Sequence, residues 1–293
     1  MIWLIGNKGM LGTELSLLLE NTGFQFIGTD REVDITNPAE LEYFATAHPI
    51  DWIINCAAYT AVDKAEDDEA ACRLLNASGV ANIAVAAKAH GARLIHISTD
   101  YVFDGKGSRP YTEEDPTCPI GVYGLTKRDG ENYVLRENPS SYIIRSAWLY
   151  GCYGNNFVNT MLRLMKEKES ISVVMDQRGS PTWAFDLSGA IITFLKYAKE
   201  GKNIPFGIYH FTNEGACTWF EFACAIYNEG RALGILSKSC DIKPCTSAEF
   251  PSKVTRPTYS VLDKTKIKKN LGLEITDWKD SLKMYLQKMT EQQ

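Results

Sequence analysis

The sequence predicts an α/β protein in which helices cover both faces of a parallel β-sheet. Five short apolar segments, at residues 1–5, 24–28, 51–56, 94–97 and 141–145, alternate with segments of helical character. This alternation is typical of parallel sheets with right-handed crossovers. A glycine-rich turn directly after the first apolar segment favours the same class, because nucleotide-binding sheets carry such a turn there.

Gly6, Gly9 and Gly12 form this turn, with the spacing G-x-x-G-x-x-G, and a helical segment follows at residues 13–20. Glycines at this position let the backbone approach a diphosphate, which the positive end of the helix attracts. Many dinucleotide-binding proteins have G-x-G-x-x-G instead, so the prediction depends on the place of the turn between strand and helix. We therefore expect a Rossmann-type doubly wound sheet.

The second apolar segment ends at Asp30 and Arg31. A carboxylate about 20 residues past the glycine turn usually holds the adenosine ribose, whereas an adjacent arginine can bind a 2′-phosphate. Both side chains are present, so the sequence leaves NADH and NADPH open as cofactors. Asp34 begins a loop that caps the next helix at Pro38, and it is a second candidate for the adenosine end.

The third apolar segment ends in the string at residues 55–60, which contains Ala57 and Ala58. Small residues at the carboxyl end of a strand allow a cofactor to lie against the backbone. A single alanine-rich helix is expected next, at residues 63–89.

Tyr123 and Lys127 are four residues apart, so on a helix they share one face. A nearby ammonium favours the ionised phenol and moves its pKa toward working pH. Such a phenol can give a proton to a carbonyl oxygen as a hydride reaches the carbon. Thr99, at the end of the fourth strand, could donate a hydrogen bond to the same oxygen. A tyrosine and a lysine four residues apart are also common on solvated helix faces, so the other motifs decide whether this pair has a catalytic role.

The alternation loosens after residue 151, where helices and strands of a smaller unit follow. We predict an NAD(P)-binding Rossmann domain at residues 1–150, with helices returning from later in the chain. Residues 151–293 are predicted to form mainly a C-terminal α/β lobe for the substrate. Aromatic side chains of this half are interpreted as core, namely Tyr150, Tyr153, Trp219 and Trp278.

Composition narrows the range of partners. The net charge of −5 shows no basic excess, so a nucleic-acid partner is not expected. No leader and no apolar run of about 18 residues is recognised, and we expect a cytoplasmic protein without a membrane partner. The eight cysteines and four histidines show no ligand spacing, and no metal site is predicted.

The assembled motifs resemble the extended short-chain dehydrogenases/reductases, most closely the dTDP-4-dehydrorhamnose reductases. The resemblance runs from residue 1 to about 285. It depends on separated strings at residues 55–66, 98–105, 123–127, 145–148, 155–157, 176–177 and 179–182, and on Arg256-Pro257 with Ser260.

The resemblance implies a role for each matching residue. Tyr123 is the general acid, and Lys127 binds the nicotinamide ribose and lowers the pKa of the tyrosine. Thr99 and Asp100 contact the sugar, and Trp148 lines its pocket. Residues implied to contact the cofactor are Met10, Leu11 and Gly12 at the phosphates, Asp30, Asp34 and Ile35 at the adenosine, and Ala57, Ala58 and Tyr59 at its middle.

The implied reaction reduces the C4 ketone of dTDP-4-dehydro-β-L-rhamnose to dTDP-β-L-rhamnose, with NADPH or NADH, for cell-surface polysaccharide biosynthesis. A dTDP-sugar is the implied small-molecule partner. The sequence leaves open whether the protein forms a homodimer. Some family members bind Mg²⁺ at a dimer contact, and no ligand set for it can be assigned here. Cys56, Tyr59 and Tyr259 depart from common family residues, but none removes a group that the chemistry needs.

Other functions remain as alternatives. A dehydratase would need an acid where Tyr101 follows Asp100, and the strings at Trp148 and 176–182 disfavour an epimerase. Reduction of another 4-keto deoxysugar nucleotide is the nearest alternative. A non-catalytic subunit resembling the regulatory subunit of methionine adenosyltransferase is another, because that subunit keeps the tyrosine and lysine. Trp148 is the feature that speaks against it.

Overall fold

A parallel sheet of six strands forms the centre of the molecule. It is seen in a computed structural model that describes residues 1–250 and 252–291. The spatial order is β10-β5-β4-β3-β1-β2, and every neighbouring pair is parallel. The strands are β1 (Ile2–Ile5), β2 (Phe26–Thr29), β3 (Trp52–Asn55), β4 (Arg93–Thr99), β5 (Ser141–Ser146) and β10 (Gly207–His210). The winding direction reverses between β1 and β3, and ligands bind at the carboxyl ends of strands at such a switch point.

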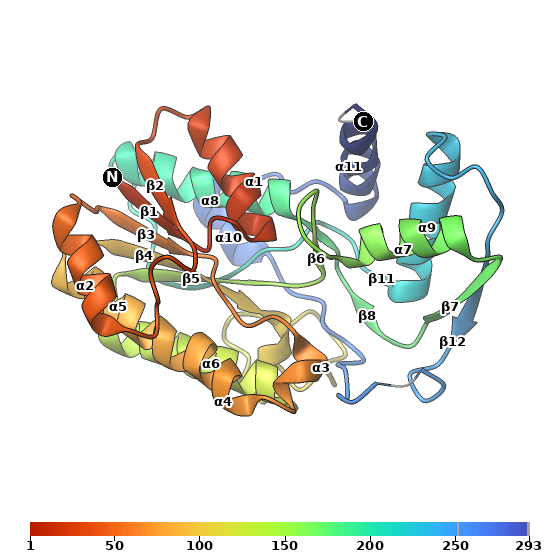
Figure 1. The fold of residues 1–293 in the computed structure, drawn as a ribbon, viewed down its shortest axis with the longest axis horizontal. Helices are drawn as coiled ribbons and strands as arrows, with labels where there is room; N and C mark the ends of the chain where they lie inside the picture. The colour runs from red at the N-terminus through yellow and green to blue at the C-terminus, as the bar shows by residue number, and fades with distance from the viewer. Residues whose placement is uncertain (251, 292–293) are drawn as a thin grey trace.

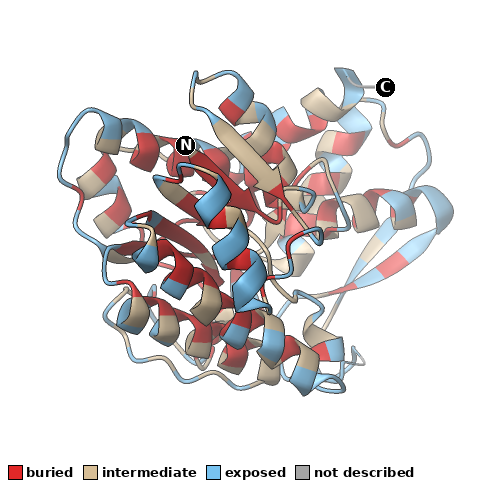
Figure 2. Cartoon of the chain, turned by 60° about the vertical axis from the view of Figure 1, so that its left-hand side comes forward, coloured by how far each residue is buried: buried red, intermediate tan, exposed pale blue. Residues whose placement is uncertain are grey.

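Helices cover both faces of the sheet, which confirms the predicted fold class (Figure 1). On one face lie α1 (Met10–Glu20), α8 (Ala184–Lys199) and α10 (Thr265–Leu271), and on the other lie α2 (Pro38–Ala47), α5 (Val80–Ala89) and α6 (Val122–Glu137). Successive side chains of β1 alternate between the two cores. Because both faces are covered, most residues of β1, β3, β4 and β5 are buried, whereas the edge strand β2 is mostly half-buried (Figure 2).

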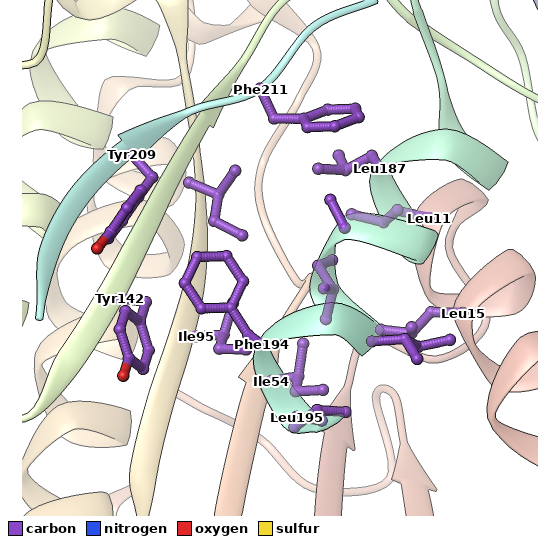
Figure 3. Close-up of a cluster of buried hydrophobic side chains, with 14 of the residues drawn as sticks. Leu11, Leu15, Ile54, Ile95, Tyr142, Leu187, Phe194, Leu195, Tyr209 and Phe211 are labelled. Atoms are coloured by element: carbon purple, nitrogen blue, oxygen red, sulfur yellow. The ribbon is translucent and has the colours of Figure 1, made fainter. Parts of the chain in front are cut away.

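The core beneath α1 and α8 shows how segments from the second half of the chain complete the packing of the sheet (Figure 3). Leu11 and Leu15 of α1 pack with Leu187 and Phe194 of α8 over the sheet. The strand β10 pairs with β5, so residues 184–210 return to the half of the molecule that the first 150 residues begin.

A second α/β unit has its own apolar core and includes the parallel strand pair of β7 with β12. Short pairs join β6 to β9 and β8 to β11. Its elements are β6 (Leu149–Tyr150), α7 (Phe157–Glu167), β7 (Ser170–Val174), β8 (Arg178–Gly179), β9 (Thr182–Trp183), β11 (Cys217–Thr218), α9 (Trp219–Ala232), β12 (Asp241–Cys245) and α11 (Trp278–Glu291). Tyr150 and Trp278 are buried in this core, as expected.

The helix expected at residues 63–89 is interrupted at residues 66–68, between α3 (Val62–Ala65) and α4 (Glu69–Arg73). From Glu69 to Ala89 it continues as expected, through α4, a π-helical turn (Leu74–Gly79) and α5. Asp68 begins α4 by accepting a hydrogen bond from the N–H of Ala71. The stretch Glu69–Ala89 is long and apolar enough to span a membrane, a property that core helices share, and half of its most apolar window is buried inside this fold.

A buried ion pair fixes α6 to the sheet. The Nε and Nη2 atoms of Arg145 on β5 donate to the two carboxylate oxygens of Glu131 on α6, at 2.9 and 2.7 Å. Ser98 of β4 donates to the same carboxylate. Both charged side chains are almost fully buried, so neither has water as an alternative partner.

Breaking this pair should destabilise the fold strongly. We expect Arg145→Met to lower the free energy of unfolding by about 3–5 kcal/mol, because the Glu131 carboxylate would be left buried and unpaired. Denaturant unfolding measures the loss. Arg136→Met, which removes a surface pair with Glu137, is the control and should cost less than about 1 kcal/mol. Equal losses in the two variants would contradict the role of the buried pair.

Candidate active site

The N-terminus of α1 fits a phosphate group. Gly9 caps the helix without a side-chain hydrogen bond, and the first turn holds no acidic residue. The first N–H groups of a helix have no partner within it and attract anions. A Cβ on Gly12 would lie 2.1 Å from the Gly6 carbonyl oxygen, and one on Gly6 would lie 2.7 Å from the Ala57 nitrogen. Gly6 also has a φ of 78°, so the turn needs glycine at both positions.

The predicted adenosine contacts lie at the end of β2 and in the loop after it. Arg31 is exposed and Asp30 is partly exposed. The carboxylate of Asp34 is exposed and accepts hydrogen bonds from the N–H and hydroxyl of Thr36. Ile35 is instead buried, where it contacts Gly79 of the π-helical turn.

The loop of small residues that follows β3, at residues 56–60, is held by Asn76, a residue that sequence analysis missed. The side-chain oxygen of Asn76 accepts from the N–H of Tyr59, and its amide donates to the Tyr59 carbonyl, at 2.8 and 3.0 Å. Asn76 lies in the π-helical turn and is fully buried. Ala57 is tied at the other end of the loop to Asn55. The loop is therefore rigid where a cofactor would lie against it.

Tyr123 and Lys127 occupy the first turns of α6, beside the end of β4. The Lys127 ammonium is buried and donates to the Ile97 carbonyl oxygen at 2.7 Å. It also lies 3.4 Å from His96 Nε2, and His96 Nδ1 in turn lies 3.1 Å from the amide nitrogen of Asn55. These contacts direct the lysine toward the carboxyl edges of β3 and β4, where the cofactor loop begins.

The expected lowering of the Tyr123 pKa is not found. Burial raises the pKa of this phenol, Thr99 acts in the opposite direction, and Asp100 adds to the rise. Burial also lowers the pKa of Lys127 to about 8, partly offset by the charge of Glu131. The sequence spacing placed the ammonium near the phenol, but desolvation of the phenol outweighs it in this structure. Tyr123 is therefore protonated at neutral pH.

Thr99 and Asp100 form a polar corner against Tyr123. The Thr99 hydroxyl donates to Asp100 Oδ1 at 3.0 Å and accepts from the N–H of Tyr101. Asp100 is 3% exposed, and burial raises its pKa to about 6 although Ser260 and Thr99 oppose the rise. Its charge is thus poorly compensated at neutral pH.

Trp148 follows β5 with a φ of 48°, the single positive value among the described non-glycine residues. Gly179 lies against its indole, because a Cβ there would be 2.6 Å from Trp148 Cε2 and 2.8 Å from Ser260 Oγ. Ser260 is also a neighbour of Asp100. The structure therefore brings Trp148 to the corner that Thr99, Asp100 and Tyr123 form.

A groove of about 350 Å³ is lined by residues of the segments 247–250 and 252–258 together with Val174 and Gln177, and it carries Lys253 and Arg256. Hydrogen bonds between Arg178 and residues 258–260 join its wall to the Trp148 corner. A second hollow, of about 550 Å³, lies between β2 and α2 and is lined by none of the predicted catalytic residues. Among residues 1–250 and 252–291, no cluster of His, Cys, Asp or Glu is arranged to hold a metal ion.

Asn76, Glu131 and Trp219 are further site-supporting residues that sequence analysis did not identify. Glu131 lies eight residues after Tyr123 and four after Lys127, so continued helical spacing could have found it. Trp219 was expected to be core, yet it is half-buried and stacks on Trp148. Nothing in the local pattern marks Asn76 or Trp219, because each acts through a segment distant in sequence.

Removing the Asp100 charge should stabilise the protein in a pH-dependent way. An aspartate carboxyl in the unfolded chain has a pKa near 3.8, whereas burial in the fold raises the pKa of Asp100 to about 6. The charge of Asp100 therefore costs stability as pH rises through this window. We expect Asp100→Asn to gain up to about 3 kcal/mol at about pH 8 and nothing at about pH 4.

Urea unfolding at the two pH values measures this gain. Asp104→Asn is the control of opposite sign, since a hydrogen bond from Tyr111 lowers the pKa of Asp104. A gain of the same size at both pH values would contradict the explanation by buried charge.

Comparison with known proteins identifies the family of this chain. The family model described as RmlD substrate binding domain matches residues 1–291. A dTDP-4-dehydrorhamnose reductase of Aggregatibacter actinomycetemcomitans is 40% identical over 95% of each chain. A probable dTDP-4,6-dihydroxy-2-methyloxan-3-one 4-ketoreductase of Streptomyces antibioticus is 41% identical over 97% of this chain and 94% of its own.

Among solved structures, a dTDP-4-dehydrorhamnose reductase of Bacillus anthracis in complex with NADP is 36% identical. It covers 98% of each chain with a TM-score of 0.91. Agreement in sequence and fold along the whole length shows that this chain belongs to the dTDP-4-dehydrorhamnose reductase family.

Proposed function

We propose that this protein reduces the C4 ketone of dTDP-4-dehydro-β-L-rhamnose to dTDP-β-L-rhamnose, with a reduced nicotinamide cofactor, for polysaccharide biosynthesis. The observation that carries the proposal is the meeting of Tyr123, Thr99, Asp100 and Trp148 at one corner. Lys127 lies one helical turn below this corner. Relatives that bear the name of this activity match over nearly their full length.

The residues present fit a nicotinamide dinucleotide. Its diphosphate would lie at the uncapped N-terminus of α1, where Met10, Leu11 and Gly12 present N–H groups. Asp30 and Arg31 would meet the adenosine ribose, and the loop at Ala57–Ala58 its middle part. The cofactor supplies hydride to C4 of the sugar.

Tyr123 donates the proton. Reduction of a ketone leaves an alkoxide, which is a far stronger base than a phenolate, so a phenol with a raised pKa still transfers its proton readily. The Thr99 hydroxyl orients the same oxygen. Lys127, with a pKa of about 8, carries a positive charge at neutral pH and would bind the nicotinamide ribose.

The second α/β unit would bind the nucleotide sugar. The groove joined to the Trp148 corner holds Lys253 and Arg256, which pair with Asp67 and Asp63 in this structure and would exchange these carboxylates for a diphosphate. We therefore keep the division of labour predicted for residues 1–150 and 151–293, with α8 and β10 completing the first unit. Reduced nicotinamides and nucleotide sugars are cytoplasmic metabolites, so we expect the enzyme there.

The decisive assay follows the loss of reduced-nicotinamide absorbance on addition of enzymatically prepared dTDP-4-dehydro-L-rhamnose. Rapid loss supports the proposal. The Streptomyces antibioticus relative favours a second candidate, reduction of a different 4-keto deoxysugar nucleotide, and that substrate class belongs in a parallel assay. No loss with either, in a protein that binds the cofactor, would favour the regulatory alternative.

Tyr123→Phe should abolish turnover, by at least about a hundredfold, because only the proton donor is lost. Cofactor binding, measured by fluorescence titration, should stay within about twofold of the wild type. Tyr133→Phe on the same helix is the matched control and should keep full activity, since Tyr133 packs only beneath Arg136 at a distance from the corner. Near-normal turnover by Tyr123→Phe would overturn the assignment of the acid.

Arg31→Ala should weaken NADPH binding by about tenfold while NADH binding changes little. The guanidinium of Arg31 is exposed and would meet a 2′-phosphate, a group that NADH lacks. Dissociation constants of the two cofactors, measured side by side, give the result. Equal weakening of both would show that Arg31 does not read the 2′-phosphate.

A further inference from the structure

Trp148 has a backbone conformation that its own chemistry disfavours. A φ of 48° brings the Cβ of an L-residue close to the neighbouring carbonyl oxygen, and bulky side chains rarely adopt it. Such strain persists only where the surroundings hold the residue in place, and it concentrates at functional sites. The contacts around the Trp148 indole therefore show what holds it.

The main contact is a face-to-face stack with Trp219. The two ring centroids are 3.5 Å apart and the planes differ by 10°. Both side chains are only half-buried, unlike the fully buried aromatics Tyr150 and Phe222 behind them. The stack thus lies at the boundary between the apolar core and the corner that holds Asp100 and Ser260. A pair of aromatic residues that served core packing alone would not need to lie at this boundary.

Trp219 is itself held firmly. It is the first residue of α9, and the capping box of Thr218 and Glu221 fixes that helix end with hydrogen bonds of 2.7 and 3.1 Å. Phe157 packs against its ring at 4.5 Å. The strand before it, β11, pairs with β8, which contains Gly179. Trp219 and Gly179 therefore belong to one local unit and both contact the Trp148 indole.

We propose that Trp219 is a positioning residue for the nucleotide sugar, which holds the strained Trp148 side chain as a preformed wall beside Thr99, Asp100 and Tyr123. This inference rests on the proposed function, because the ligand of that wall is the keto-deoxysugar. Loss of the stack lets Trp148 relax to an ordinary backbone conformation and removes the wall without touching the proton donor or the cofactor loop.

The test compares Trp219→Leu with the conservative Trp219→Phe and with Phe220→Leu, a neighbour on α9 that forms no ring pair with Trp148. For Trp219→Leu, KM for dTDP-4-dehydro-L-rhamnose should rise roughly tenfold, the size expected when one strained residue is released. The dissociation constant for NADPH should not change. Trp219→Phe should recover most of the affinity, and Phe220→Leu should match the wild type.

A spectroscopic signal reports the stack independently of turnover. Two indoles stacked this closely couple their electronic transitions and give a paired circular-dichroism band. Trp219→Leu and Trp148→Phe should both lose this band, and Phe220→Leu should keep it. Binding of the product dTDP-L-rhamnose, measured by calorimetry, should weaken in parallel with KM.

The outcomes separate the inference from the proposed function. If the wild type shows the paired band but neither turns over the sugar nor binds the product, the proposed function fails. If the wild type is active and Trp219→Leu loses the band with KM and product affinity unchanged, the positioning role is wrong. Should Trp219→Leu not fold, Trp219→Met takes its place, and an unchanged KM and product affinity in that variant would equally exclude the positioning role.

Discussion

The structure depends on how α6 is fixed to the sheet. Tyr123, Lys127 and Glu131 recur every four residues on one side of this helix, and the buried pair between Glu131 and Arg145 holds that side against β4 and β5. A charge buried in this way tolerates little displacement, since any shift would leave it without compensation. Tyr123 and Lys127 therefore have fixed positions beside the carboxyl ends of the strands.

Burial shifts the pKa values of Tyr123, Asp100 and Lys127 in the directions that favour the neutral form of each side chain. The pKa values of Tyr123 and Asp100 rise and that of Lys127 falls, with desolvation as the largest cause for each. A dry corner of this kind strengthens every hydrogen bond to a developing oxyanion. It also means that Tyr123, the acid we propose, is a protonated phenol at neutral pH and is not tuned to ionise there.

The two units are joined around this corner by contacts from the end of the chain. Arg256 pairs with Asp63 of α3 at 3.0 Å, and Lys253 pairs with Asp67 in the turn after α3, so the loop before Tyr259 is held at this part of the chain. On the opposite side, Lys288 of α11 reaches the buried Glu14 of α1 at 2.8 Å. The first two pairs are largely exposed and contribute little to the free energy of unfolding. Their main effect is to fix the position of this loop.

Local spacing in the sequence is enough to predict the parallel α/β sheet, the glycine turn and the tyrosine-lysine face of α6. The break of the expected helix at 63–89, the Asn76 clamp and the pairing of Glu131 with Arg145 emerge only when the chain is folded. So do the raised pKa of Tyr123 and the stack that holds Trp148. Each of these depends on burial or on contact between distant segments, and no local pattern carries that information.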